Sequence, residues 1–307
     1  MPHWRHLTAG LLYNDFDRDT YLHLSAGTGQ VDAFKTSLSE EVDRNIKNKH
    51  GQTSFHLACK NGRLIIVEFL LESTDLNIDV SAKDKNGYTG FFFVCQEGHS
   101  NVAKVLIEKS VALGIDSNPK DAGNLTAFTK ACIKGHSDIV KLIIDFSVDT
   151  GGIDFNTHNE FGYCAFRFAC ANGHSDLVKI LIENAVLLNL DLNTQNPETG
   201  CTGFHWACLQ GHSDMVKIFM ANVASFDFNL KNIYGQTGFY IACGFNHYNV
   251  AKMLMENSAT LNIDLNAKDN NSQTAFQLAC KNGNVNVTKM LMENSAILNQ
   301  TYLRLPS

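Results

Sequence analysis

The 307-residue chain has no long apolar run, and none of its windows approaches the roughly 20 apolar residues that a membrane helix requires. The apolar patch near its N-terminus, Ala9 to Tyr13, is too short for the core of a secretory signal peptide. Nine cysteines without such a signal favour a reducing compartment and free thiols. We therefore expect a cytoplasmic protein that does not insert into a membrane.

The chain also lacks a run of basic residues. Its 25 lysines and arginines are spread along the sequence, and 31 acidic residues give a formal net charge of −6. This balance argues against a nucleic-acid or anionic-membrane surface. The sequence also lacks a phosphate-binding loop, a dinucleotide fingerprint and a hydrolase nucleophile elbow. We expect no catalysis, no cofactor and no nucleic-acid partner.

What the sequence does contain is a motif that recurs about every 37 residues, with Phe at its third position and Cys at its seventh. The seven copies begin at Thr53, Thr89, Thr126, Cys164, Thr202, Thr237 and Thr274, and a related copy begins at Thr20. A period in this range is typical of stacked helical units, each of which packs only on its neighbours. Such an array can grow long without a single large core.

One unit from the middle of the array shows the pattern expected for two short helices. Gly200 permits a turn with positive φ, and the side chain of Thr202 can accept the free N–H groups at a helix start. Phe204 opens the apolar face of this first helix, and Gly211 ends it. A second apolar stripe follows Ser213. We predict that each unit consists of a helix, a tight turn, a second helix and a projecting loop.

This pattern resembles the ankyrin repeat family over nearly the whole chain. The family's Thr-Pro-Leu-His-x-Ala-Ala signature is best preserved as Thr20-Tyr-Leu-His-Leu-Ser-Ala26. Its Gly-His-x-x-Val-Val stretch appears as Gly135-His-Ser-Asp-Ile-Val140, and its loop is similar to Ile263-Asp-Leu-Asn-Ala267. The resemblance implies an all-α solenoid of stacked helix-turn-helix units with projecting β-hairpin-like loops.

The expected array covers residues 19–296, between an N-terminal flank, 1–18, and a C-terminal tail, 297–307. We place its eight repeats near 19–47, 48–84, 85–121, 122–158, 159–196, 197–231, 232–268 and 269–296.

Three departures from the family pattern affect the expected geometry. No unit keeps the family's Pro, so the first helices begin without a preset φ. Phe replaces Leu in seven units, which should widen the spacing between units or thin a neighbouring layer. Most units carry about four extra residues, or about one helical turn. We therefore expect a second helix that is lengthened by one turn and ended by Asn189 or Asn262.

The recurring cysteines and histidines invite a metal-binding or catalytic interpretation. Equivalent residues in stacked units lie about 8–10 Å apart, whereas a disulfide needs Cα atoms within about 7 Å and zinc needs converging ligands. We therefore expect small core thiols and no metal site. Five histidines follow the turn between the helices, and we expect them to bridge turns by hydrogen bonds: His99, His136, His174, His212 and His247.

Ankyrin repeat proteins bind other proteins through a concave groove and the loop tips, so the resemblance implies a protein partner. The groove positions are the two residues before the loop Gly, the one after it and the two after the Ala-Cys pair. From them we select as partner-binding candidates His50, Gln52, Tyr88, Gln96, Leu125, Phe161, Tyr163, Gln210, Ile233, Tyr234, Phe245 and Lys281. Exposed aromatic side chains there favour binding, although Phe161 and Ile233 could instead cover neighbouring loops.

The leading hypothesis is a non-catalytic, monomeric scaffold or adaptor. A second hypothesis is that the chain is the regulatory or targeting portion of a longer protein, such as an enzyme or a channel. A third is that it is a modification substrate, because Asn193 and Asn266 resemble the loop asparagines that asparaginyl hydroxylases modify in ankyrin repeats.

Overall fold

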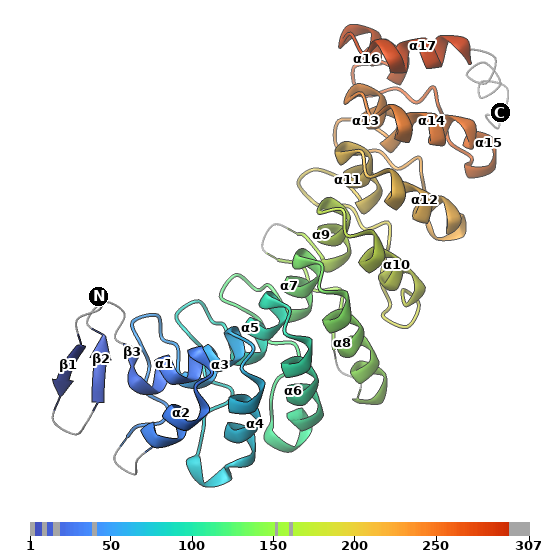
Figure 1. The fold of residues 1–307 in the computed structure, drawn as a ribbon. Helices are drawn as coiled ribbons and strands as arrows, with labels where there is room; N and C mark the ends of the chain where they lie inside the picture. Colours follow the sequence, from blue (N-terminus) through green and yellow to red (C-terminus); the bar gives the residue numbers. More distant parts are fainter. Residues whose placement is uncertain are drawn as a thin grey trace. The chain divides into compact units, whose positions relative to one another are not determined.

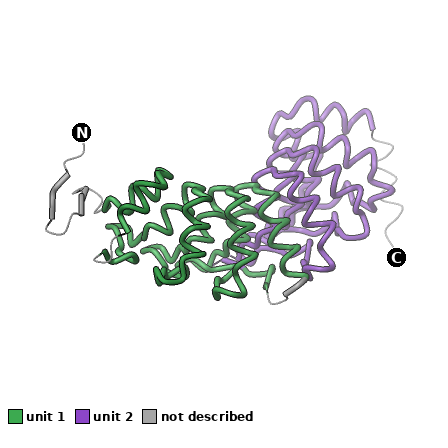
Figure 2. The backbone as a smooth tube through the Cα atoms, turned by 60° about the horizontal axis from the view of Figure 1, so that its bottom comes forward, with its two compact units in different colours: residues 1–157 green, residues 158–307 purple. Residues whose placement is uncertain are grey.

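In a computed structural model, the chain folds into helix pairs that stack in sequence order (Figure 1). The structure describes residues 4–7, 11–14, 19–38, 42–150, 153–159 and 162–294. Two compact units, residues 1–157 and 158–307, each contain their own series of stacked pairs (Figure 2). We call these unit 1 and unit 2, and we call the members of each pair the first and the second helix.

In unit 1 each first helix packs on the next first helix and on the second helix of its own pair. The first helices are α1 (Tyr21–Thr28), α3 (Ser54–Lys60), α5 (Gly90–Glu97) and α7 (Ala127–Lys134). The second helices are α2 (Val31–Ser37), α4 (Leu64–Glu72), α6 (Ser100–Leu113) and α8 (Ser137–Thr150). A single 3₁₀ turn, η1 (Thr74–Leu76), follows α4.

Unit 2 repeats the same arrangement. Its first helices are α9 (Ala165–Ala171), α11 (Gly203–Gln210), α13 (Gly238–Gly244) and α16 (Ala275–Lys281). Its second helices are α10 (Ser175–Glu183), α12 (Ser213–Ala221), α14 (Tyr248–Glu256) and α17 (Val285–Glu293). Two short elements, η2 (Val223–Ser225) and α15 (Ser258–Leu261), follow α12 and α14. The predicted helix-turn-helix array is therefore confirmed.

The residue before each first helix determines how the helix begins. The side chain of Thr202 accepts a hydrogen bond from the backbone N–H of His205, as the sequence predicted, and so satisfies a donor that has no partner inside the helix. Equivalent threonines cap six other first helices: Thr20, Thr53, Thr89, Thr126, Thr237 and Thr274. Cys164 occupies this position before α9, and its side chain makes no cap bond.

The core of each unit lies between successive helix pairs. In α3, Phe55, Ala58 and Cys59 fall on one helix face, and each is at most 1% exposed. This burial follows from their spacing of three and four residues along the helix. The cysteine of the motif therefore acts as a small apolar core residue in this repeat.

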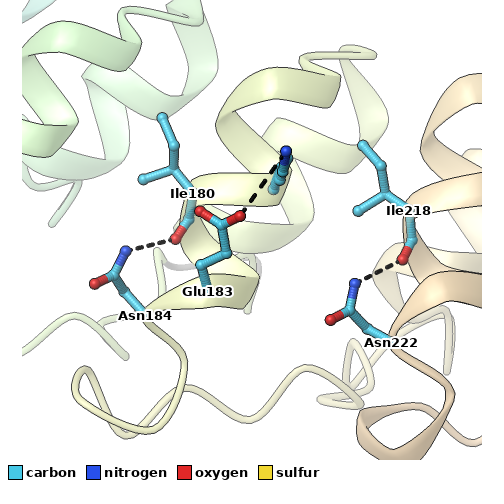
Figure 3. Close-up of polar contacts among 6 residues, drawn as sticks. Ile180, Glu183, Asn184, Ile218 and Asn222 are labelled. Atoms are coloured by element: carbon cyan, nitrogen blue, oxygen red, sulfur yellow. Dashed lines mark hydrogen bonds and ion pairs between the residues drawn. The ribbon is translucent and has the colours of Figure 1, made fainter.

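The extra residues of each repeat follow the second helix in two different ways. Asn184 ends α10 by donating a hydrogen bond from its side chain to the carbonyl of Ile180, and Asn222 ends α12 in the same way at Ile218 (Figure 3). In α6 and α8 the corresponding residues are Lys109 and Phe146, and these helices continue to 14 residues each. Asparagine interrupts a helix because its amide competes for backbone groups.

The predicted one-turn extension is thus correct for α6 and α8 and wrong for α10, α12 and α14. Asn189 and Asn262 do end the extra turn after α10 and α14, because both adopt left-handed backbone with φ near 50°. Among the described residues, no helix combines the length and apolar character needed to cross a membrane.

The projecting loops lie beside the first helices, on the side away from the second helices (Figure 1). Each loop closes like a hairpin; for example, the N–H of Asn232 donates to the carbonyl of Gln236 at 3.0 Å. Neighbouring loops are also joined at their tips, because the N–H of Ile233 donates to the carbonyl of Thr199 at 3.1 Å. The expected β-hairpin-like loops are confirmed, and their backbones form a ladder along the array.

Three short strands precede the first repeat. They are β1 (Trp4–Leu7), β2 (Leu11–Asn14) and β3 (Asp19–Thr20), and they form an antiparallel sheet in that order. Strand β2 pairs with β3 through Tyr13 opposite Thr20 and Asn14 opposite Asp19. The sequence predicted no secondary structure for residues 1–18, so this sheet is an addition to the all-α architecture.

Candidate protein-binding surface

Buried histidines of the first helices hold the loops in position. The backbone N–H of Thr53 donates to Nδ1 of His56, so the proton of this ring is on Nε2, which donates to the carbonyl of Tyr88 in the next loop at 3.1 Å. His23 bonds Gln52 and His205 bonds Gln236 in the same manner. Burial lowers the pKa of all three histidines, which keeps them neutral near pH 7.

A second set of histidines joins each helix–helix turn to the turn of the preceding repeat. Nε2 of His99 lies 2.9 Å from the carbonyl oxygen of Lys60, and Nε2 of His247 lies 2.7 Å from that of Leu209. The ring of His99 also covers Gly62, where an added Cβ would lie 2.6 Å from its Nδ1. The predicted turn-bridging role is therefore confirmed for His99, His136, His212 and His247.

The predicted partner-binding residues differ in their accessibility. Six are exposed: His50, Gln210, Ile233, Tyr234, Phe245 and Lys281. Four are half-buried: Tyr88, Gln96, Leu125 and Tyr163. Gln52 is buried, and Phe161 lies outside the described residues.

Gln52 therefore does not belong to the accessible surface that the sequence predicted for it. Its side-chain amide points to the next hairpin, where Nε2 lies 3.4 Å from Oδ2 of Asp84. Its carbonyl receives the hydrogen bond from His23. The position of Gln52 after the loop Gly does not reveal this contact, because the contact depends on a polar partner in the neighbouring repeat.

Tyr88 and Tyr163 are half-buried because each stacks on residues of its own repeat. The ring of Tyr88 lies parallel to that of Phe92 at a centroid distance of 4.4 Å, and burial raises the pKa of its phenol. The ring of Tyr163 packs 5.3 Å from Phe168, with the Arg167 guanidinium 4.6 Å from its centre. Both side chains cover the first helix as well as lining the surface.

Arg167 is a site that the sequence analysis missed. It occupies the position at which α1, α3 and α11 carry histidine, and it is 1% exposed. Its Nη2 donates to the carbonyl of Gly162, while Nε and Nη1 have no hydrogen-bond partner among the described residues. Burial lowers the pKa of this guanidinium. The signal in the sequence is that Cys164 and Arg167 replace the Thr and the His of one capping pair together.

Three large apolar side chains are exposed in the repeat of α13 in unit 2. Ile233 and Tyr234, at the loop tip, are 50% and 60% exposed, and Phe245, which follows α13, is 61% exposed. The loop backbone is fixed on both sides, because Ile233 bonds Thr199 and Asn270 donates its N–H to the carbonyl of Tyr234 at 3.0 Å. Ile233 and Tyr234 are thus exposed to solvent although hydrogen bonds fix the backbone that carries them.

The two candidate modification sites lie in the loops. Nδ2 of Asn193 donates to the carbonyl of Ser225, and its Oδ1 accepts the N–H of Asp227, each at 3.0 Å. The N–H of Asn266 donates to Oδ1 of Asp264 at 3.0 Å. The carboxamide of Asn193 therefore joins consecutive loops, which gives it a structural role whether or not it is modified.

The thiols are free, and seven of the nine cysteines are buried; Cys201 is half-buried and Cys280 is exposed. The expectation that every motif cysteine is a core residue is therefore wrong at Cys280, because α16 has no later helix pair among the described residues to cover it. Within the described residues, no group of three or more His, Cys, Asp or Glu side chains is placed to hold a metal ion.

Stacked helix pairs whose loops bond tip to tip define a helical repeat protein. A family profile described as ankyrin repeats (3 copies) matches the chain at residues 6–84, 77–151, 110–195, 143–232, 184–269 and 205–302. The chain belongs to the ankyrin repeat family, as its motifs indicated. It is also 34% identical over 64 residues to alpha-latroinsectotoxin-Lt1a from Latrodectus tredecimguttatus, a match that covers 21% of this chain and 4% of the toxin.

Proposed function

We propose that the protein is a non-catalytic interaction scaffold or adaptor of the cytoplasm, which binds a protein partner through its loop tips and first helices. The observation that carries this proposal is the exposure of Ile233, Tyr234 and Phe245 on a hydrogen-bonded backbone. Ankyrin repeats are generally protein–protein interaction modules, and the family assignment supports the same conclusion. The adaptor acts as a monomer in this proposal.

Large apolar side chains on an ordered backbone are suited to binding for two reasons. Aromatic anchors dominate the energetics of protein interfaces, and each typically contributes at least 2 kcal/mol when truncated to alanine. A backbone that is already fixed loses little conformational entropy on association. Tyr234 and Phe245 meet both conditions, whereas the half-buried Tyr163 is partly committed to Phe168 and Arg167.

The test is a binding measurement with a purified partner, identified by affinity capture and mass spectrometry. We expect Tyr234→Ala and Phe245→Ala each to weaken binding by about 2 kcal/mol or more in calorimetry, with thermal melts nearly unchanged. Glu183→Ala and Glu256→Ala are the controls, since both carboxylates form only exposed ion pairs along second helices. Equal losses at both sets, or losses at the glutamates alone, would assign binding to the second helices.

A second candidate is that the chain is the regulatory or targeting portion of a longer protein. The toxin match favours it, because 64 residues amount to only 4% of that relative. An antibody against unit 2, used on an extract of the source cells, distinguishes the two candidates by size. A band near 34.0 kDa supports the separate adaptor, and a much larger band supports the portion of a longer protein.

Hydroxylation of Asn193 and Asn266 is compatible with either candidate. If the two residues are hydroxylated, mass spectrometry of peptides from the natural protein will show one added oxygen atom on each. Peptides without this oxygen would contradict the hydroxylation hypothesis.

A further inference from the structure

Three exposed lysines occupy one position in successive hairpins of unit 1. Lys47, Lys83 and Lys120 are 36 and 37 residues apart in the sequence, and each directly precedes the residue whose N–H closes its hairpin. The hairpins are in contact, because Nζ of Lys47 donates to the carbonyl of Lys83 at 3.0 Å. The sequence showed no basic run, but the repeat period gathers these lysines into a row.

The first helices add further positive charge beside this row. Lys130 and Lys134 lie one turn apart on α7, and Lys85 lies at the tip of the second of the three hairpins. Burial, and then the charge of Lys134, lowers the pKa of Lys130, whereas the charges of Asp121 and Glu97 raise it, so Lys130 lies near one cation and two carboxylates. Stacked repeats lie about 10 Å apart, slightly more than the screening length of about 8 Å in physiological salt, so each lysine of the row can attract a separate anionic group.

The acidic residues of the same hairpins accept hydrogen bonds from backbone N–H groups of their own turns. Asp84 is buried, and its Oδ1 accepts the N–H groups of Asn86 and Tyr88. Oδ1 of Asp121 likewise accepts the N–H of Leu125 within its own hairpin. Among the described residues, six of the seven lysines of these hairpins and of α7 form no ion pair with a carboxylate: Lys47, Lys83, Lys85, Lys120, Lys130 and Lys134.

The opposite side of unit 1 has the opposite charge. The second helices α4, α6 and α8 and the turns after them carry ten acidic residues: Glu68, Glu72, Asp75, Asp79, Glu108, Asp116, Asp138, Asp145, Asp149 and Asp154. Two of the few lysines there are paired, Lys104 with Glu108 and Lys109 with Glu72. The net negative charge of the chain therefore conceals a separation of charge between two faces of this unit.

Apolar side chains accompany the lysines. Leu24 in α1 and Leu57 in α3 are half-buried, and they occupy the motif position that Lys130 occupies in α7. Equivalent positions of stacked first helices lie on the same side of the array. The surface thus combines unpaired ammonium groups with accessible leucines.

We propose that the lysine face of unit 1, formed by Lys47, Lys83, Lys85, Lys120, Lys130 and Lys134, binds an extended acidic segment of a partner protein. This inference rests on the proposed function and names the chemistry of the partner. Carboxylates of the segment satisfy the lysines, and apolar residues between them contact Leu24 and Leu57. A nucleic acid is disfavoured because a longer polyanion would be repelled by the acidic second helices and would gain nothing from the leucines.

Unit 2 shares only part of this chemistry. Lys231 and Lys268 occupy the position of Lys83 in two of its hairpins, and Nζ of Lys231 donates to the carbonyl of Lys268 at 2.9 Å, but no repeat of unit 2 carries lysine at the positions of Lys85, Lys130 or Lys134. The position of Lys83 is occupied by Gln195 in one of its hairpins, and the tip position of Lys85 is occupied by Ile233 in another. The position of Lys134 corresponds to Gln210 in α11. The positions of Lys85, Lys130 and Lys134 are therefore basic in unit 1 only, and Lys83 and Lys130 can be changed without altering Ile233, Tyr234 or Phe245.

The test uses the full chain and a fluorescein-labelled peptide of about 10 residues that alternates Glu with Leu, which spans about 33 Å when extended. Peptide binding is followed by fluorescence anisotropy at low and high salt. The variant is Lys83→Glu with Lys130→Glu, and the control of equal charge change is Lys104→Glu with Lys141→Glu on the second helices. Circular dichroism and thermal melts establish that both variants remain folded.

We expect the natural chain to bind this peptide, to bind a Gln–Leu peptide at least tenfold more weakly, and to lose affinity as salt rises. The variant on the lysine face should lose about tenfold in affinity, and the control should change by less than about twofold. No binding of the acidic peptide, or equal losses in variant and control, would overturn the proposal. A labelled oligothymidylate of equal charge that bound as tightly would assign the face to nucleic acid instead.

Failure here is separable from failure of the proposed function. If Tyr234→Ala and Phe245→Ala still weaken binding of a purified partner while the acidic peptide does not bind, the scaffold function stands and the lysine face is discarded.

Discussion

The ring of Phe204 in α11 occupies the space that a side chain at Gly238 in α13 would need. A Cβ built at Gly238 would overlap Cε1 of this ring. The same relationship joins Phe55 to Gly90 at 2.6 Å and Phe166 to Gly203 at 2.9 Å. Of the two consequences expected from replacing Leu by Phe, a thinner neighbouring layer is therefore the one observed at these three contacts. The larger Phe ring fits because the next repeat carries Gly at the position of the family's Pro.

Gly238→Ala should destabilise the protein by about 1–3 kcal/mol, because an overpacked core forces side chains or backbone to shift. Helix propensity alone would favour Ala by about 1 kcal/mol. A net decrease in the free energy of unfolding would therefore be due to the overlap with Phe204. Gly238→Ala should cost less stability in a protein that also carries Phe204→Leu. Urea denaturation of both single variants and of the double variant measures this difference.

A matched control is Gly123→Ala. A Cβ there meets only Oδ1 of Asp121 at 3.5 Å, an ordinary contact, so we expect a change within about 0.5 kcal/mol. If Gly238→Ala is stabilising in both backgrounds, the Phe–Gly packing account is wrong.

Cys164→Thr combined with Arg167→His should stabilise unit 2. The double change restores the capping pair found at Thr202 and His205 and removes a buried guanidinium that has two unpartnered nitrogens. We expect a gain of about 1–3 kcal/mol, because a missing cap and an uncompensated buried charge both cost free energy. Calorimetric melts measure it; a lower melting temperature for the double variant would show that Arg167 is better satisfied than its contacts indicate.

Stability should fall as the pH drops below about 6.5, the ordinary pKa of histidine. Burial lowers the pKa of His23, His56 and His205 in the folded state, so the unfolded chain binds more protons in this range. Their contribution is therefore fully present above that pH and is lost progressively below it. Urea midpoints at several pH values between about 5 and 7.5 measure the slope.

Gln277 supplies the control for this pH effect. Its Oε1 accepts the N–H of Thr274 at 2.9 Å, as Nδ1 of His56 accepts that of Thr53. His56→Gln with His205→Gln should therefore keep the caps and flatten the slope. An unchanged slope would mean that other groups govern the acid sensitivity.

Native thiol labelling should show one fast site. Cys280 is exposed, whereas burial raises the pKa of Cys59, Cys95 and Cys243 and excludes reagent from them. A maleimide should modify Cys280 first, and Cys280→Ser should remove the fast phase. Denatured protein should release nine reactive thiols, and a lower count would contradict the free thiols of the structure.

The sequence was sufficient for features that depend on one repeat or on the repeat period. The helix pairs, the cap at Thr202 and the turn-bridging histidines all follow from local spacing. The ends of the second helices were also readable in principle, since Asn184 stops α10 where Lys109 allows α6 to continue. The number of extra residues alone does not distinguish a longer helix from a separate turn, because the residue at the position of Asn184 decides between them.

The binding surface was less predictable, because accessibility depends on side chains of adjacent repeats. Gln52 is buried by a contact with Asp84, and Tyr88 is half-buried by stacking on Phe92. The lysine face was missed for a different reason. Charges counted along the chain look dispersed, whereas stacking brings residues 36 or 37 positions apart, such as Lys83 and Lys120, side by side.

The ladder of hydrogen bonds between loop tips uses main-chain atoms, as between Ile233 and Thr199 or Lys85 and His50. These main-chain hydrogen bonds do not depend on which side chains the loop tips carry. Mutations at the tips can therefore change which partner is bound without disrupting the hydrogen bonds between loops. Selection can then act on each repeat's tip independently. A single gene of this kind can acquire a lysine at one tip, such as Lys85, and an apolar side chain at the equivalent tip of another repeat, such as Ile233, by point substitution alone.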